Sequence, residues 1–258
     1  MTKAPVLATT ATEWGHSRWE TLERCPRSYE LRYVKRVDSG NPMNNAAQIG
    51  IATHRGLAEY YSLMKEHRSP KHINAMIDAG PEDVFVKAEA KRLCAAYIAY
   101  WEERESFTVV DVERAVGVEL KHKGRVVNFT MRLDLVIRDN SGKLILVDHK
   151  TTAANRGEFA LEHAVNSQFV GSAAAWPYSE PLSAVMLNRI IRTKVPSFDR
   201  HSFIITEAEV QRWKRDHIML DQDRRRYERA KHYPMHRSSC QGRYGLCDFY
   251  NVCHGGGQ

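Results

Sequence analysis

The sequence predicts an α/β fold in which helices flank a central β-sheet, and two observations carry that prediction. The first is a meander whose turns are a Lys-Gly pair and the run Asn140-Ser-Gly, both typical of hairpin connections. The second is that helical patterns precede and follow this meander, as expected for a layered α/β domain. Strands are expected at residues 115–122, 125–138, 143–150, 184–191 and 202–206.

The helices are predicted from periodicity and start signals. Ser17 and Glu20 have capping-box spacing, and Pro26 suits the first turn of a second helix. Small residues at Gly50, Ala52 and Gly56 would let their helix approach another backbone closely. Further helices are expected at residues 48–60, 83–104, 159–176 and 207–231, and loops at 1–12, 38–46, 66–83, 151–158 and 192–200.

Length and composition define the general class. The 258 residues are enough for one sizeable core, and 43% hydrophobic with 27% charged residues is typical of a soluble globular protein. No apolar run approaches a membrane span and no secretory signal pattern is seen, so we expect a cytoplasmic protein. The formal net charge of +7 favours a polyanionic partner, with nucleic acid ahead of an anionic membrane surface.

Charged residues end the strand at 143–150. Its apolar run stops at Asp148-His149-Lys150, and strand alternation places Asp148 and Lys150 on one face and His149 on the other. Asp134 lies in the preceding strand. Solvated charges at a strand end are the simple interpretation. The alternative is a site in which two carboxylates hold Mg²⁺ or Mn²⁺ and Lys150 orients a water that attacks a phosphodiester.

Cysteines cluster near the end of the sequence. Cys240, Cys247 and Cys253 fall within fourteen residues, which in an intracellular chain favours metal or cluster ligation over disulfides. His254 would complete a zinc site, or Cys25 an all-cysteine site that joins the two chain ends. Three unrelated thiols remain the simple alternative.

The chain resembles the PD-(D/E)xK nucleases, in the branch of RecB-type nuclease domains, Cas4 and the AddB-like iron–sulfur nucleases. The matching segments occur in the family's order over nearly the whole chain. They are Cys25-Pro26 with its helix, Gly50-Ile-Ala-Thr-His54, Arg132-Leu-Asp134, Val147-Asp148-His149-Lys150-Thr151, Gln168, and Cys247 to Cys253.

The resemblance implies a restriction-endonuclease-like core with a mixed central β-sheet flanked by helices, and it implies a role for each matching residue. His54, Asp134, Asp148 and the main-chain carbonyl of His149 would hold Mg²⁺ or Mn²⁺, with Lys150 acting on the water and Gln168 beside the active site. Cys25, Cys240, Cys247 and Cys253 would hold a structural [4Fe–4S] cluster, with Zn²⁺ as the alternative. Glu119 on the first strand is a further candidate, open between a solvated and a functional role.

We therefore expect one nuclease domain over residues 1–258. Its core would span 46–231, and 13–37 with 232–258 would form the cluster lobe. The expected function is a metal-dependent DNA exonuclease acting on ends or single strands, in repair, recombination or CRISPR adaptation, with any helicase motor on a separate protein. A catalytically dormant DNA-end-binding module and a zinc-containing nucleic-acid-binding protein are the alternatives.

Overall fold

The computed structural model describes residues 13–40, 43–64, 67–153, 166–242 and 245–255. The helices are α1 (His16–Arg24), α2 (Pro26–Tyr29), α3 (Asn45–Ser62), α4 (Pro70–Asp78), α5 (Val84–Trp101), α7 (Ser167–Ala174), α8 (Glu207–Ala230) and α9 (Tyr250–His254). The strands are β1 (Thr108–His122), β2 (Arg125–Arg138), β3 (Leu144–Thr152), β4 (Leu182–Ile191), β5 (Ser197–Phe203), β6 (Gln241–Gly242) and β7 (Gly245–Leu246). None of the described helices is both long and apolar enough to cross a bilayer.

The main sheet is mixed, in the order β1-β2-β3-β4-β5. β1, β2 and β3 form an antiparallel meander, β3 and β4 run parallel, and β5 returns antiparallel to β4. Lys123 and Gly124 both have positive φ at the β1–β2 turn, the conformation that a two-residue hairpin requires. The predicted mixed α/β fold is therefore confirmed.

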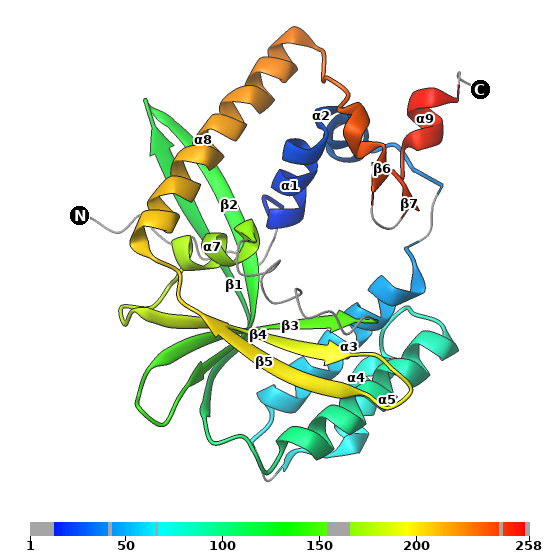
Figure 1. Cartoon of the computed structure of the whole chain (residues 1–258), viewed down its shortest axis with the longest axis vertical. Coiled ribbons are helices and arrows are strands. Elements are labelled where there is room, and N and C mark those ends of the chain that lie inside the picture. The colour runs from blue at the N-terminus through cyan, green and yellow to red at the C-terminus, as the bar shows by residue number, and fades with distance from the viewer. Residues whose placement is uncertain (1–12, 41–42, 65–66, 154–165, 243–244, 256–258) are drawn as a thin grey trace.

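The two faces of the sheet belong to two hydrophobic cores (Figure 1). Helices α1, α7 and α8 cover one face, where Phe129, Phe169 and Trp213 are buried. Helices α3, α4 and α5 cover the other, where Leu57, Leu93 and Val147 pack. We call these the α8 core and the α3 core.

β2 takes part in both cores. Phe129 and Leu133 pack in the α8 core, whereas Leu135 and Ile137 pack in the α3 core. Strict strand alternation would place all four side chains on one face of the sheet. Because they pack in two different cores, the side-chain alternation of β2 must change at Asp134. β1 changes at the same level, where Glu113 adopts the left-handed conformation, with φ of 52°. Such a conformation is uncommon for a residue other than glycine, and here it falls between Val112 and Arg114, which pair with Leu135 and Leu133.

Polar side chains cap three of the longer helices. Asn44 accepts a hydrogen bond from the Ala47 amide of α3, and Asp83 accepts one from Val86 of α5. Thr206 and Glu209 form a reciprocal capping box on α8. The capping box expected at Ser17 is absent, because α1 begins at His16 after Gly15 and has no side-chain cap. The chain enters α1 instead through paired main-chain and side-chain bonds between Trp14 and Thr130 of β2.

Two expected loops contain regular structure. The segment at 66–83 holds α4, whose Ile73 and Ile77 are buried although its flanks are polar. The basic stretch at 192–200 contributes to β5, which begins at Ser197 and ends at Phe203 where 202–206 was expected. β5 is the edge strand of the sheet, and its Phe198 packs on Tyr97 at 5.4 Å between ring centroids.

The boundaries of two other elements differ from those expected from the sequence. β1 starts at Thr108 where the sequence indicated 115, because a bulge between Val109 and Asp111 breaks the alternation. The helix expected at 159–176 is seen as α7, and its expected residues 159–165 lie outside the described residues, as does the lead-in at 1–12.

The segment of α1 and α2 lies beside the last described segment of the chain. The Arg27 amide donates to the Pro234 carbonyl at 3.1 Å, and the Ser239 hydroxyl donates to the Arg24 carbonyl at 2.9 Å. Arg32 forms an ion pair with Asp248. α2 therefore packs beside β6, β7 and α9 at one end of the molecule (Figure 1).

Replacing Gly56 with alanine tests the close contact between α3 and α5. A Cβ on Gly56 would lie 2.7 Å from the Cys94 sulfur and 2.9 Å from Ile77, both buried. We expect Gly56→Ala to lower the free energy of unfolding by about 1 kcal/mol or more through overpacking, measured by urea titration. Gly50→Ala is the matched control, since its Cβ would meet only Thr151, at 4.0 Å. Equal stability of the two variants would contradict this packing.

Candidate active site

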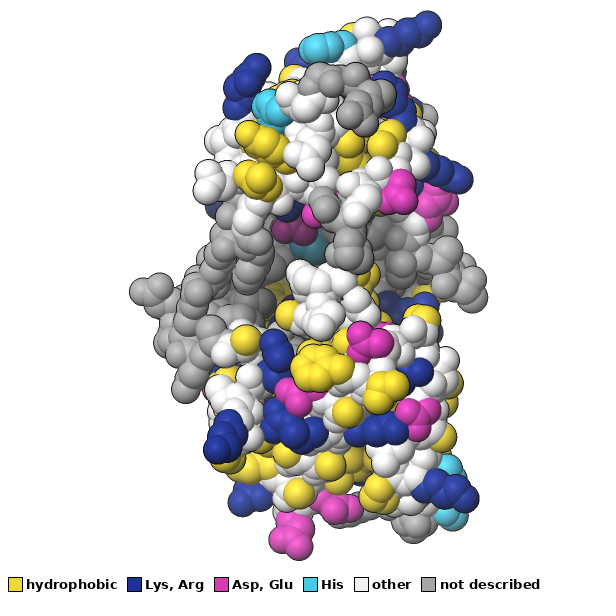
Figure 2. Space-filling model, turned by 90° about the vertical axis from the view of Figure 1, so that its right-hand side faces the viewer, with side chains coloured by type: hydrophobic (Ala, Val, Ile, Leu, Met, Phe, Trp, Pro, Cys, Tyr) yellow, Lys and Arg dark blue, Asp and Glu magenta, His cyan; other side chains and the backbone are white. Residues whose placement is uncertain are grey.

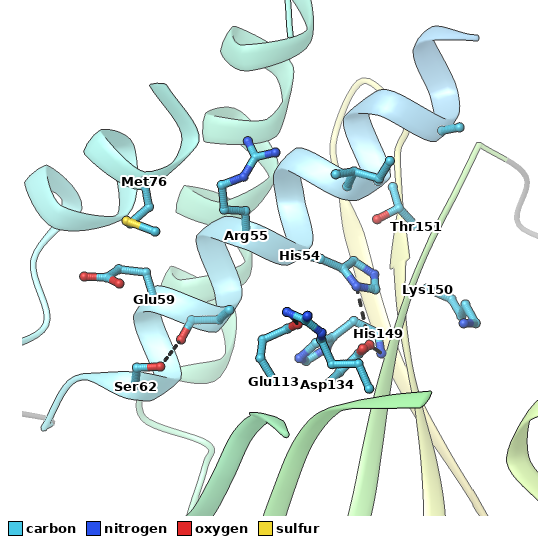
Figure 3. A pocket seen from close by; sticks show the side chains of 15 residues that line it. His54, Arg55, Glu59, Ser62, Met76, Glu113, Asp134, His149, Lys150 and Thr151 are labelled. Atoms are coloured by element: carbon cyan, nitrogen blue, oxygen red, sulfur yellow. Dashed lines mark hydrogen bonds and ion pairs between the residues drawn. The ribbon is translucent and has the colours of Figure 1, made fainter. Parts of the chain in front are cut away.

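A cavity of about 690 Å³ lies where β1, β2 and β3 meet α3. Figure 2 shows the molecule hollowed at mid-height, with acidic and histidine side chains inside the hollow. The chemically active side chains that line the cavity are those of His54, Arg55, Glu59, Glu113, Arg132, Asp134 and Lys150. Figure 3 shows several of them converging from α3 on one side and the strands on the other.

Asp134 joins three elements at the floor of the cavity. Leu135 of β2 pairs with Val147 of β3, so the next residues along the two strands are Asp134 and Asp148. The Asp134 carboxylate accepts a 2.9 Å hydrogen bond from the His149 amide. His54 reaches down from α3 and places Nδ1 3.4 Å from the same carboxylate (Figure 3).

Asp148, Lys150 and Gln168 form a closed triangle of polar contacts. The Lys150 ammonium lies 2.8 Å from Asp148 Oδ2 and donates to Gln168 Oε1 at 3.2 Å. The Gln168 amide donates to Asp148 Oδ1 at 3.0 Å. Gln168 is held in place because α7 starts at Ser167, where Asn166 caps the Gln168 main-chain amide at 2.8 Å.

Burial sets the electrostatics of this triangle. Burial raises the pKa of the Asp148 carboxyl above its usual range, and Asp134 adds to that effect against the opposing influence of Lys150. Burial by itself would lower the pKa of Lys150, but Asp148 and Asp134 outweigh it and the pKa lies above its usual value. Lys150 is therefore a cation at neutral pH, next to a carboxylate that is costly to bury without a positive partner.

His149 points away from this triangle. Its Nδ1 lies 2.6 Å from the Asn188 amide nitrogen, and its ring stacks against Tyr61 at 5.9 Å between centroids. Burial, with a further effect from His54, holds the pKa of His149 well below its usual value, so the ring is neutral. The His149 main chain faces the cavity while its side chain is buried in the α3 core.

The structure brings two further residues to the site. Glu113 lines the cavity opposite Asp134, and its nearest cation is Arg132 at 3.5 Å. Burial raises the pKa of Glu113, and Asp134 raises it further. His16 of α1 interacts electrostatically with Lys150 and Asp148 from the other side, and burial lowers its pKa. No short-range motif marks either residue.

Glu119, the carboxylate that the sequence suggested on this strand, lies elsewhere. It pairs with Asn128 farther along the β1–β2 hairpin and is half-buried, outside the cavity lining. The bulge and the left-handed Glu113 change the side-chain alternation of β1, which a regular strand pattern could not anticipate.

The cysteines expected to act together come from both ends of the chain. Cys25 is buried at the start of α2, and Cys253 lies on α9. Burial raises the pKa of Cys253, and its electrostatic neighbours include Cys247 and Cys25. The Cys247 amide donates to the Cys240 carbonyl at 2.9 Å, and Cys240 Sγ lies 3.4 Å from His254 Nε2.

The donor set at the cavity suits a hard divalent cation. Two carboxylates and an imidazole face one space, and oxygen ligands are those that Mg²⁺ and Mn²⁺ prefer. Within the described ranges, no group of three or more His, Cys, Asp or Glu side chains is already arranged as an ion site, either here or at the cysteines. At the cavity the reason is local, because Asp148 is turned to Lys150 and Gln168.

Comparisons with known proteins show the family of the chain. The family model of the PD-(D/E)XK nuclease superfamily matches residues 13–254. A crystal structure from Eubacterium rectale described as a "Putative exonuclease" is similar in fold, with a TM-score of 0.54 and 12% identity over 93% of this chain and 87% of that chain. The structure of SSO0001 matches at 19% identity over 79% of this chain and 84% of that chain, with a TM-score of 0.35. No curated protein matches the chain.

Glu113→Gln tests the acidic pair at the cavity. The folded protein raises the pKa of Glu113. The ionised Glu113 carboxylate therefore destabilises the folded state at pH values above this raised pKa, and the destabilisation is absent below the ordinary Glu pKa of about 4.3. We expect metal-free Glu113→Gln protein to melt at a higher temperature than wild type at pH 7, with the difference shrinking as the pH falls toward 4. Glu119→Gln, on the same strand, is the control and should leave the melting temperature unchanged at both pH values.

Proposed function

Because the chain belongs to the PD-(D/E)XK nuclease superfamily, we propose that it is a metal-dependent DNA exonuclease acting at ends or on single strands. One observation carries the proposal. Lys150, Asp134 and His54 line a single open cavity, and Asp148 and Gln168 contact Lys150 next to it. This combination offers cation ligands and a fixed ammonium group within reach of one substrate position.

The chemistry of each side chain at the site indicates its proposed role. Asp134, Asp148, His54 and the main-chain carbonyl of His149 would hold Mg²⁺ or Mn²⁺, which when bound polarises the phosphodiester and lowers the pKa of the attacking water. Lys150 would donate hydrogen bonds to that water and offset charge on the phosphate. Gln168 forms hydrogen bonds to both the Lys150 ammonium and the Asp148 carboxylate and so holds the two groups in a fixed relative position.

A polyanionic substrate fits the charge of the protein. The formal net charge of +7 favours nucleic acid, and Arg132 and Arg55 stand at the cavity that would receive its backbone. We propose DNA ends as the substrate within a repair, recombination or CRISPR-adaptation process in the cytoplasm. A separate helicase or recombination protein would supply the substrate strands.

We also propose that Cys25, Cys240, Cys247 and Cys253 hold a [4Fe–4S] cluster that joins the two chain ends. The support is the electrostatic proximity of Cys253 to Cys247 and Cys25, together with the main-chain bond between Cys247 and Cys240. Thiolates are the ligands that such clusters use. The 3.4 Å contact between Cys240 and His254 favours zinc as the second candidate at this place.

Nucleotide release from end-labelled linear DNA and from a covalently closed circle, with Mn²⁺ or Mg²⁺, tests the proposed activity. We expect wild type to degrade the linear DNA, and Lys150→Ala to be slower by roughly 10²- to 10³-fold, the range for loss of a hydrogen-bond donor that stabilises developing charge. Lys143→Ala, an exposed lysine just before β3, is the matched control and should keep full activity.

The other outcomes discriminate between functions. Cutting of the closed circle would add an endonuclease activity. Binding of DNA ends without metal-dependent release would sink the exonuclease proposal and favour a catalytically dormant end-binding module.

Metal analysis of anaerobically purified protein tests the cluster. We expect about four iron and four sulfide per chain, consistent with a [4Fe–4S] centre, and loss of both in Cys247→Ser. Cys94→Ser is the control, since Cys94 is buried between α3 and α5, where burial raises its pKa to about 12. One zinc per chain, lost in a His254→Ala variant, would replace the cluster proposal with a zinc site.

A further inference from the structure

We propose that Asn188, oriented by Arg200, is a positioning residue that fixes the His149 ring and thereby the main chain between Asp148 and Lys150. The inference deepens the proposed nuclease function and rests on it for its consequence. Its structural part concerns a hydrogen-bond network on the face of the sheet opposite the Asp148–Lys150–Gln168 triangle. Nothing in the proposed reaction uses these side chains directly.

The network links five parts of the fold in the α3 core. His149 on β3 and Asn188 on β4 are register partners in parallel strands, and Asn188 is fully buried. Its amide nitrogen lies 2.6 Å from His149 Nδ1 and donates to the Tyr97 hydroxyl of α5 at 2.9 Å. Arg200 of β5 donates to Asn188 Oδ1 at 3.1 Å.

Arg200 determines which way the Asn188 amide faces. A guanidinium can only donate, so the atom it contacts on Asn188 must be the carbonyl oxygen. The NH₂ group must then face His149 and Tyr97. His149 Nδ1 therefore accepts a hydrogen bond, which leaves the ring proton on Nε2.

Arg200 is itself fixed from several sides. It forms an ion pair with Glu105, donates to the Tyr97 hydroxyl at 2.8 Å, and lies 3.7 Å above the Trp101 ring. Tyr61 closes the network by donating to Glu105 at 2.6 Å, and its oxygen lies 2.8 Å from that of Tyr97. Because the Tyr61 proton goes to Glu105 and Tyr97 accepts from both Arg200 and Asn188, the Tyr97 hydroxyl is left to donate to Tyr61.

The consequence for the active site runs through the main chain of His149. The ring is anchored on one face, and the amide of the same residue donates to Asp134 on the other. Asp148 and Lys150 flank it directly, so any rotation of the His149 peptide displaces both. Groups that orient a metal-binding strand in this way change metal affinity or rate by about 10- to 100-fold when they are lost.

Asn188→Asp is the main test, because it keeps the shape and the acceptor for Arg200 but replaces the donor that faces His149. In metal-free wild type, the ¹⁵N–¹H spectrum of the histidine rings should show His149 protonated on Nε2, with its signal identified by its loss in His149→Phe. In Asn188→Asp we expect the proton on Nδ1. An unchanged ring would overturn the proposal whatever the enzyme's activity.

Kinetic measurements distinguish a positioning role of Asn188 from a general effect of its substitution on the stability of the protein. We expect Asn188→Asp and Asn188→Leu to raise the Mn²⁺ concentration for half-maximal cleavage or to lower kcat by about 10- to 100-fold, with KM for DNA unchanged. Arg200→Lys, which keeps a cation near Glu105, should recover part of the rate that Arg200→Met loses. Tyr60→Phe is the matched control, because its buried hydroxyl lies outside the network and its loss should leave both values unchanged.

The two proposals can fail separately. If wild type releases no nucleotides but Asn188→Asp still moves the ring proton, the network is right and the nuclease function is wrong. If wild type is active and Asn188→Asp alters the spectrum but neither kcat nor the metal requirement, the network is structural only and the positioning role is overturned.

Discussion

The passage of β2 from one hydrophobic core to the other at Asp134 is the constraint on which the rest of the structure depends. Leu133 packs with the α8 core and Leu135 with the α3 core, so a polar residue is left at the crossing. β1 follows the same change through the left-handed Glu113. The two helical layers consequently leave a hollow at this level, and the carboxylates lie at its floor. The same geometric feature thus produces both the cavity and its charge.

The buried charged side chains next to this crossing need oppositely charged partners. Asp148 and Lys150 are buried next to one another, and a buried charge without a partner is costly. Gln168 forms a hydrogen bond with each of these two groups, which helps to keep the pair in a single geometry. A divalent cation held by Asp134 and Asp148 would relieve the carboxylate repulsion that the metal-free site retains. Cation binding at these carboxylates would therefore be linked to the stability of the site.

The two faces of β3 have different roles, because one carries the proposed catalytic side chains and the other anchors the strand in the α3 core. Asp148 and Lys150 face α7, while His149 between them faces a network of tyrosine, asparagine and arginine in the α3 core. A strand with charged groups on one face only needs firm anchoring on the other, because its main chain carries both. The polar residues of this core thus connect the edge strand β5 to the strand that carries Asp148 and Lys150.

The sequence by itself determined the meander of β1, β2 and β3, the order of the elements and the pair Asp148 and Lys150 on one strand face, because alternation and turn chemistry are local signals. It also indicated Gln168, through the resemblance to known nucleases. It could not indicate Glu113 in place of Glu119, since a bulge and a left-handed residue alter the strand alternation. His16 and Asn188 came only from the tertiary structure. Their positions depend on how α1 docks on β2 and how β4 registers with β3, and these contacts form between segments far apart in the chain.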